Sequence, residues 1–366
     1  MKKYILLFLL LILPTIANAT PVADESFDSD IFKAEVVSVI EEDVKDVGDG
    51  FSLIQQEILL IGLEGDWLGK EFKVNTINDI EVLASKRYGV GDKVLVNHSI
   101  DYEGEDSFYI IDNIRFNALS LIFLLFIVAI IVVGRWKGLR SIISLVFSFL
   151  VIFYFIIPNI FNGYNPVVIA LVGGLIMTPL IVYFTEGLNN RSHAAVISIY
   201  ASLFVTGILS WFFIKISHLV GISEEMMFLV GSSHVVDFRG LLLAGMIIGS
   251  LGVLDDLVVS QISAVEEMSS LDKKMNNKEL YNKASRVGVS HLGSMTNTLF
   301  LAYAGVSLPL LLLFYIKQPP FMTVGEVINS ELIATEIIRT LVGSIGLILA
   351  MPISTILAIK FFRRND

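Results

Sequence analysis

The sequence contains no cysteine, which excludes disulfide bonds, thiolate nucleophiles and cysteine-ligated zinc from this protein. Charged residues are also scarce, because they make up 17% of the 366 residues, against roughly 25% in soluble domains. Apolar residues account for 54% of the chain. This balance indicates a protein that lies mostly within a lipid bilayer.

Basic residues are fewer than acidic ones, 26 against 36, which gives a formal net charge of -10. An acidic chain of this kind argues against a nucleic-acid partner. The five histidines are scattered and no H-E-x-x-H motif is present. We therefore expect no metal site and no cofactor.

The first 19 residues have the order of a secretory signal. Two lysines precede an apolar run from Ile5 to Leu13, and the small-residue stretch Ala17–Ala19 follows. We expect residues 1–19 to be a signal peptide that is cleaved after Ala19, and the alternative is an uncleaved anchor helix. Either outcome delivers Thr20 to the far side of the membrane.

Residues 20–116 show a period of two, which is typical of strands. The pattern predicts five strands with glycine-rich turns between them, over Ala34–Val36 with Val37–Val39, Leu53–Ile61, Phe72–Val74, Val94–Val96 and Phe108–Ile111. This strand number suits a small, all-β, OB-like domain. OB-like domains often bind chain-like ligands through basic and aromatic side chains. Such side chains are sparse here, which favours a scaffold role or the docking of a protein partner.

Residues 117–366 contain apolar runs that are long enough to cross a bilayer. There are seven: Ala118–Val133, Leu139–Ile157, Val167–Phe184, Ala194–Ile216, Leu241–Ser260, Leu292–Ile316 and Glu336–Phe361. Basic residues gather after the first, third, fifth and seventh runs. The sequence therefore predicts an α-helical polytopic membrane protein with about seven spans, its β domain extracytoplasmic and its C-terminus cytoplasmic.

The basic segment after the fifth run predicts a cytoplasmic loop over residues 261–289. Within it, Ser269–Asp272 can act as a capping box for a short amphipathic helix. A solvated connector is the alternative.

The fifth run contains a stripe of small and polar residues on one helix face. Its members follow one another at steps of three or four: Gly245, Gly249, Gly252, Asp256, Ser260, Ser263 and Glu267. Such glycines allow close helix packing, and an acid among them is expected to point into the bundle or a wet cavity. Asp256 lies roughly 22 Å along a span that must cross about 30 Å. Asp255 lies about 100° around the same helix, and the alternative places both acids at the cytoplasmic interface.

The sixth run begins with a second polar group that comprises His291, Ser294, Asn297 and Thr298. Because one loop joins the fifth and sixth runs, these residues can lie near Asp255, Asp256 and Ser260, which predicts a proton relay or a cation site. The alternative for His291 is an interfacial anchor. Gly305 and Pro309 are expected to take part in helix packing, and Pro309 is also expected to bend the helix beyond Gly305. Arg339 in the seventh run could attract an anion, although snorkelling to the interface explains it as well.

Four stretches also carry a resemblance to a known family: Gly134–Leu139, Thr185–Asn189, Gly249–Asp256, and Asn297–Gly305 with Ser307–Pro309. In these stretches the chain resembles the YibE/F family of bacterial membrane proteins, and the likeness extends over nearly the whole chain from about Phe32. The resemblance implies a several-pass protein of the bacterial cytoplasmic membrane with an extracytoplasmic domain before it. It implies no particular substrate.

Three functions compete. The first is a transporter or permease-like protein that uses Asp256 for proton or cation coupling, or to bind a small solute. The second is a non-catalytic subunit of an export or assembly complex, which docks partners through the β domain and the loop. The third is an intramembrane aspartyl protease, which is disfavoured because Asp255 and Asp256 are neighbours on one helix and point apart. We therefore expect the protein not to be an enzyme.

Overall fold

The computed structural model of the protein describes residues 30–48, 51–75, 87–100, 104–221, 237–317, 319 and 321–363. The chain divides into two compact units, one formed by residues 20–129 and the other containing residues 130–366. The predicted signal peptide, residues 1–19, lies outside the described residues.

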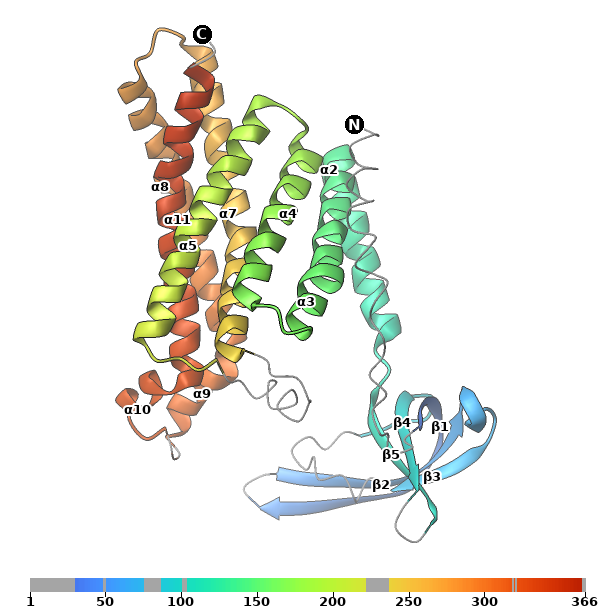
Figure 1. Ribbon diagram of the computed structural model, residues 1–366. Coiled ribbons are helices and arrows are strands. Elements are labelled where there is room, and N and C mark those ends of the chain that lie inside the picture. Colours follow the sequence, from blue (N-terminus) through green and yellow to red (C-terminus); the bar gives the residue numbers. More distant parts are fainter. Residues whose placement is uncertain are drawn as a thin grey trace. The chain divides into compact units, whose positions relative to one another are not determined.

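The first unit contains the five predicted strands, which form one antiparallel sheet (Figure 1). Their order is β3–β2–β1–β4–β5, with bounds β1 Asp30–Gly48, β2 Phe51–Gly62, β3 Glu71–Asn75, β4 Lys93–Ile100 and β5 Asp106–Asn113. The central strand β1 pairs with both β2 and β4, and shifts of register interrupt its pairing with β2. Such irregularities increase strand twist and bend a sheet. The result is a half-barrel with β3 and β5 at its edges, rather than a closed barrel.

Alternate residues of the strands face a shared apolar core, which explains the period of two in the sequence. The buried members include Phe32, Ala34, Val36, Ile58, Leu60, Phe72, Val94, Val96 and Ile110. The rings of Phe72 on β3 and Phe108 on β5 stack at 4.4 Å between centroids, so aromatic packing brings the two edges of the sheet together.

The second unit is helical. Its helices are the second part of α2 (Phe116–Val151), α3 (Ile157–Phe161), α4 (Pro166–Glu186), α5 (Asn190–Ile216), α7 (Phe238–Leu271), α8 (Asn277–Val306), α9 (Leu308–Ile316), α10 (Val324–Asn329) and α11 (Glu331–Arg363). Among the described residues, five helical stretches are long and apolar enough to cross a membrane: 116–161, 166–186, 190–216, 238–271 and 331–363. A mostly helical membrane protein is therefore confirmed. The number of seven spans and the orientation stay predictions.

The longest of these stretches is broken at Arg135. This residue has a left-handed φ of 49° with ψ of −129°, and two helices meet there within α2. A Cβ atom at Gly138 would overlap the carbonyl oxygen of Ile130, so the chain can turn this closely only with glycine. The break falls in the short gap that separates the first two predicted spans.

The predicted sixth span is not one continuous helix. α8 ends at Val306, Ser307 intervenes, and α9 begins at Leu308 with Pro309 in its first turn. Proline is tolerated at that position because the first helical N–H groups have no partner within the helix. Neither α8 nor α9 is among the five stretches described above.

Most of the predicted loop 261–289 is helical, so its bounds are corrected, whereas the helix expected within it is present as the start of α8. α7 continues to Leu271 and α8 begins at Asn277, so only residues 272–276 connect them. The cap of α8 is also different, because Asn276 accepts a hydrogen bond from the backbone N–H of Glu279 at 2.8 Å. A hydropathy pattern shows where the apolar part of a helix ends, but the helix can continue through polar residues beyond that point.

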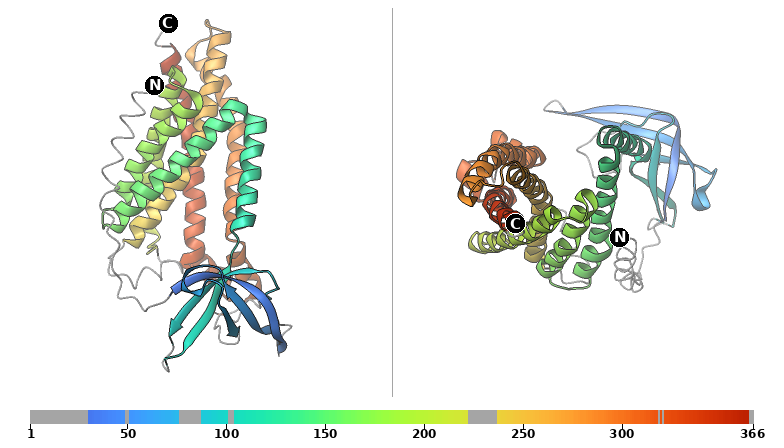
Figure 2. Two further views of the ribbon diagram at one scale, coloured as in Figure 1. Left: turned by 90° about the vertical axis from the view of Figure 1, so that its right-hand side faces the viewer. Right: turned by 90° about the horizontal axis from the view of Figure 1, so that it is seen from above.

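The bundle is organised around α5, α7 and α11, which all contact one another (Figure 2). α4 packs against α5 and α7, and α8 packs against α7 and α11. The fully buried side chains lie along these contacts and include Ile199, Leu203, Ile247, Leu254, Leu257 and Leu347. The small residues between the helices allow close approach, as at Gly346, where a Cβ atom would overlap the Thr206 side chain.

Candidate functional site

The two neighbouring acids of α7 have different surroundings. Asp256 is exposed, whereas Asp255 is partly buried and its Oδ1 atom is fully buried without a hydrogen-bond partner among the described residues. Successive residues of a helix point about 100° apart, so only one of two neighbours can face the core. The buried carboxylate on which the sequence analysis centred is therefore Asp255 and not Asp256.

Asp255 lies near further negative charge. Glu186, at the end of α4, and Asp256 are both close enough to Asp255 for their charges to repel it. Arg191 of α5 pairs with Glu186 at 3.8 Å and with Glu266 at 2.5 Å. Among the described residues, no basic side chain forms an ion pair with Asp255, so its charge has no local counterion.

Two of the three stripe glycines of α7, Gly245 and Gly252, have open space beside them. Among the described residues, and apart from the helix's own backbone, no atom lies within 4 Å of a Cβ built on Gly245, Gly252 or, in α8, Gly305, and at Gly249 only the Tyr303 hydroxyl does, at 3.6 Å. Gly245, Gly249 and Gly252 are exposed, as are Gly305 and Pro309. Gly245, Gly252 and Gly305 were predicted to pack helices, but no neighbouring helix among the described residues lies against them.

The polar residues predicted at the start of the sixth span are exposed on α8. They are His291, Ser294, Asn297 and Thr298. The Thr298 hydroxyl donates to the Ser294 carbonyl at 3.0 Å, and that of Ser260 donates to the Asp256 carbonyl at 2.5 Å. Among the described residues, no hydrogen bond or ion pair joins the polar side chains of α8 to Asp255 or Asp256. The structure thus does not bring the predicted residues into one contact network.

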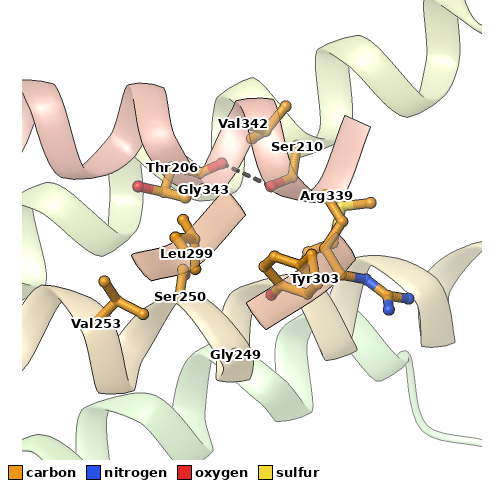
Figure 3. A pocket seen from close by; sticks show the side chains of 11 residues that line it. Thr206, Ser210, Gly249, Ser250, Val253, Leu299, Tyr303, Arg339, Val342 and Gly343 are labelled. Atoms are coloured by element: carbon orange, nitrogen blue, oxygen red, sulfur yellow. Dashed lines mark hydrogen bonds between the residues drawn. The ribbon is translucent and has the colours of Figure 1, made fainter. Parts of the chain in front are cut away.

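A polar crevice that the sequence did not predict lies between four helices (Figure 3). It encloses about 320 Å³ of space including its open mouth, and the part within the bundle leaves barely as much room as one water molecule needs. Its polar or small lining residues are Thr206 and Ser210 of α5, Gly249 and Ser250 of α7, Tyr303 of α8, and Arg339 and Gly343 of α11.

The charge in this crevice belongs to an ion pair on α11. Arg339 donates to Glu336 at 2.9 Å, one helical turn earlier. The Nε atom of Arg339 and Oε2 of Glu336 are buried without a partner among the described residues. Anion binding and interfacial snorkelling were the two expectations for Arg339, and its pairing with Glu336 was not among them, although an acid and a base at i and i+3 in an apolar run indicate such a pair.

Three hydroxyl groups of the crevice already donate their hydrogen bonds within their own helices. Thr206, Ser210 and Ser250 donate to carbonyls of their own helices, so only their oxygen lone pairs can receive another donor. The described residues contain no group of three or more histidine or acidic side chains that could hold a metal ion. The crevice and Asp255 are therefore polar sites whose unpaired atoms are an arginine N–H and carboxylate oxygens.

Comparison with known proteins gives one result. A family model described as YibE/F-like protein matches residues 122–364. No curated protein and no solved structure matches the chain. The match includes α4, α5, α7, α8 and α11, and thus both polar sites.

Proposed function

The chain belongs to the YibE/F-like family, and on this premise we propose that it is a membrane transporter or permease-like protein for a small solute or ion. In this proposal a buried carboxylate of α7 takes up a proton or a cation during transport. The protein lies in the bacterial cytoplasmic membrane, with the β domain outside, and acts without covalent catalysis.

The observation that carries the proposal is the unpaired Oδ1 atom of Asp255. A carboxylate oxygen without a donor or counterion is costly in an apolar bundle, and it requires a proton, a cation or water as its partner. The nearby charges of Glu186 and Asp256 increase that requirement, because they repel a negative charge at Asp255. Exchange of such a partner is what couples ion movement to transport.

The polar crevice supports a path that includes this carboxylate. Ser250 lines the crevice and precedes Asp255 by five residues on α7, which is about 7.5 Å along the helix axis. The crevice adds an unpaired N–H group at Arg339 on the facing helix α11. Polar groups therefore follow one another along the same bundle, as a path for a solute or ion requires.

Proton flux into liposomes tests the role of Asp255. The purified full-length chain is reconstituted with a pH-sensitive dye inside, and a potassium diffusion potential, negative inside, drives protons inward. We expect flux above that of protein-free liposomes. In Asp255→Asn the flux should fall by about tenfold or more, the effect of raising a barrier by about 1.4 kcal/mol, because an amide cannot exchange a proton.

Glu267→Gln is the matched control, since Glu267 is an exposed acid of the same helix α7. It removes one negative charge from α7, as Asp255→Asn does, and should retain the wild-type flux. Equal flux in Asp255→Asn and wild type would contradict the proposal, and so would a wild-type flux no greater than that of empty liposomes.

A second candidate function is that of a non-catalytic subunit in an export or assembly complex. It is favoured by apolar side chains on the outer side of the β sheet, where Ile31, Tyr109 and Ile111 are exposed. Exposed apolar groups of this kind are typical of sites that dock protein partners. Absence of activity in the purified chain, with an ATPase that co-purifies in stoichiometric amount, would favour this function over transport.

A further inference from the structure

The open side of the bundle carries polar side chains on two adjacent helices. We call it the α7–α8 face and define it by Gly252, Asp256 and Ser260 of α7 with His291 and Asn297 of α8, which are all exposed. The side chains of Asp256, His291 and Asn297 have no hydrogen-bond partner among the described residues.

These residues lie within or beside apolar helical runs, where a polar side chain cannot face lipid without a large cost. Asp256 is the strongest case, because it lies within the predicted fifth span and in the apolar stretch of α7. The α7–α8 face therefore requires a polar partner.

The acid and the imidazole of this face lie at the same level of the bundle. Gln261 of α7 donates to the carbonyl of Ala284 in α8 at 3.1 Å, and a Cβ at Gly288 would meet the Gln261 side chain. The two helices follow one another in the chain through the short connection 272–276 and run antiparallel. Gln261 is therefore level with the turn of α8 between Ala284 and Gly288. Asp256 lies five residues before Gln261, and His291 lies about five residues after the midpoint of that turn, so the two side chains are at the same level.

We propose that the partner is a second copy of this chain, in a dimer whose two-fold axis runs along the membrane normal. Such an axis preserves depth, so Asp256 of one copy meets His291 of the other twice. The face is thus complementary to itself in charge and hydrogen bonding. The open position at Gly252, where a Cβ would meet no other atom, allows the second copy to approach closely. This dimer does not depend on whether the protein transports a solute.

Cysteine cross-linking tests the dimer directly, because the natural chain has no cysteine. Gly252→Cys introduces one thiol on the α7–α8 face, and the full-length variant is oxidised in native membranes. A disulfide requires Cα atoms about 4.4–6.8 Å apart, so a close contact should convert the 40.5 kDa chain to a reducible dimer. The matched control is Phe204→Cys, on an exposed part of α5, which should stay monomeric.

A charge exchange tests the pairing of Asp256 with His291. We expect Asp256→His and His291→Asp each to lower the cross-linking yield of the Gly252→Cys chain by about tenfold, which corresponds to about 1.4 kcal/mol. The double exchange should restore the yield, since it recreates the pair with its partners reversed. Unchanged yields in both single variants would overturn the pairing.

Two other results would overturn the dimer. In the first, Gly252→Cys forms no disulfide but is labelled by a membrane-impermeant methanethiosulfonate, which would show that the face lines an aqueous path. Absence of both would show that lipid, another protein or another segment of the same chain covers it.

Discussion

Asp255 and Asp256 show how strongly the surroundings of a side chain depend on its place around a helix. The sequence placed both acids in the fifth span. It also predicted that Asp256 faces the bundle, because Asp256 lies on the same helix face as three glycines. The structure buries the Oδ1 atom of Asp255 and leaves Asp256 exposed. The residue type was therefore predictable, but the buried member of the pair depended on which face of α7 meets its neighbours.

At the same scale, the contact of Glu64 with Lys33 makes the stability of the β domain depend on pH. Lys33 donates to Glu64 with its ammonium group at 2.9 Å and with its backbone N–H at 3.0 Å. The side-chain hydrogen bond from Lys33 is the main reason that the pKa of Glu64 lies below its ordinary value. The stability from this contact is therefore present above the ordinary carboxyl pKa and is lost as pH falls through the lowered pKa.

We predict that Glu64→Gln lowers the urea midpoint of the β domain at pH 7 and that the difference from wild type disappears under acidic conditions. Unfolding is followed by the fluorescence of Trp67 in a full-length background with Trp136 and Trp211 replaced by Phe. The effect should be small, because the pair is exposed to solvent. A difference that persists at a pH below the lowered pKa would contradict this origin.

At the scale of helices, glycine spacing predicted a packing face on α7, and the structure places the close contacts elsewhere. Gly346 of α11 lies against Thr206 of α5, whereas a Cβ atom added at Gly245 of α7 would have no neighbour within 4 Å. Both glycines follow small-residue spacings that look alike in sequence. Only the neighbouring helix decides which of them needs to lack a side chain.

We predict that Gly346→Ala destabilises the bundle by about 1–3 kcal/mol, because the added methyl group forces α5 and α11 apart or displaces Thr206. Thr206 is held in place by its hydrogen bond to the Ser202 carbonyl. Gly245→Ala should be neutral or stabilise by up to about 1 kcal/mol through helix propensity. Thermal unfolding in detergent measures both, and equal midpoints for the two variants would refute the assigned contact.

The sequence predicted helix boundaries correctly only where nearby residues determine them. The break at Arg135 falls in a short basic gap between apolar runs, and the discontinuity before Pro309 follows from the restricted geometry of proline. The extension of α7 to Leu271 was missed, because its last turns are polar. Those turns pack against other parts of the bundle, as the buried Val265 and Ser269 show, and such tertiary contacts do not appear in a hydropathy pattern.

At the scale of the whole molecule, the orientation in the membrane remains a prediction from the distribution of basic residues. Asp66 and Lys273 are exposed, and single cysteines at these positions report on the two sides. We expect Asp66→Cys to react with an impermeant thiol reagent in cells whose cytoplasmic membrane is intact. Lys273→Cys should react only after that membrane is permeabilised. The reverse labelling pattern would contradict the predicted orientation.

The sequence alone determined the class of protein, the five strands and most of the long apolar helices, because hydropathy and periodicity are properties of local segments. It also supplied the residues that carry the family resemblance. Only the tertiary structure decided that the Oδ1 atom of Asp255 is buried, that Arg339 lines a crevice, and that Gly252 on the α7–α8 face has open space beside it. Burial of a side chain depends on which helices surround it, and residues distant in sequence supply those helices.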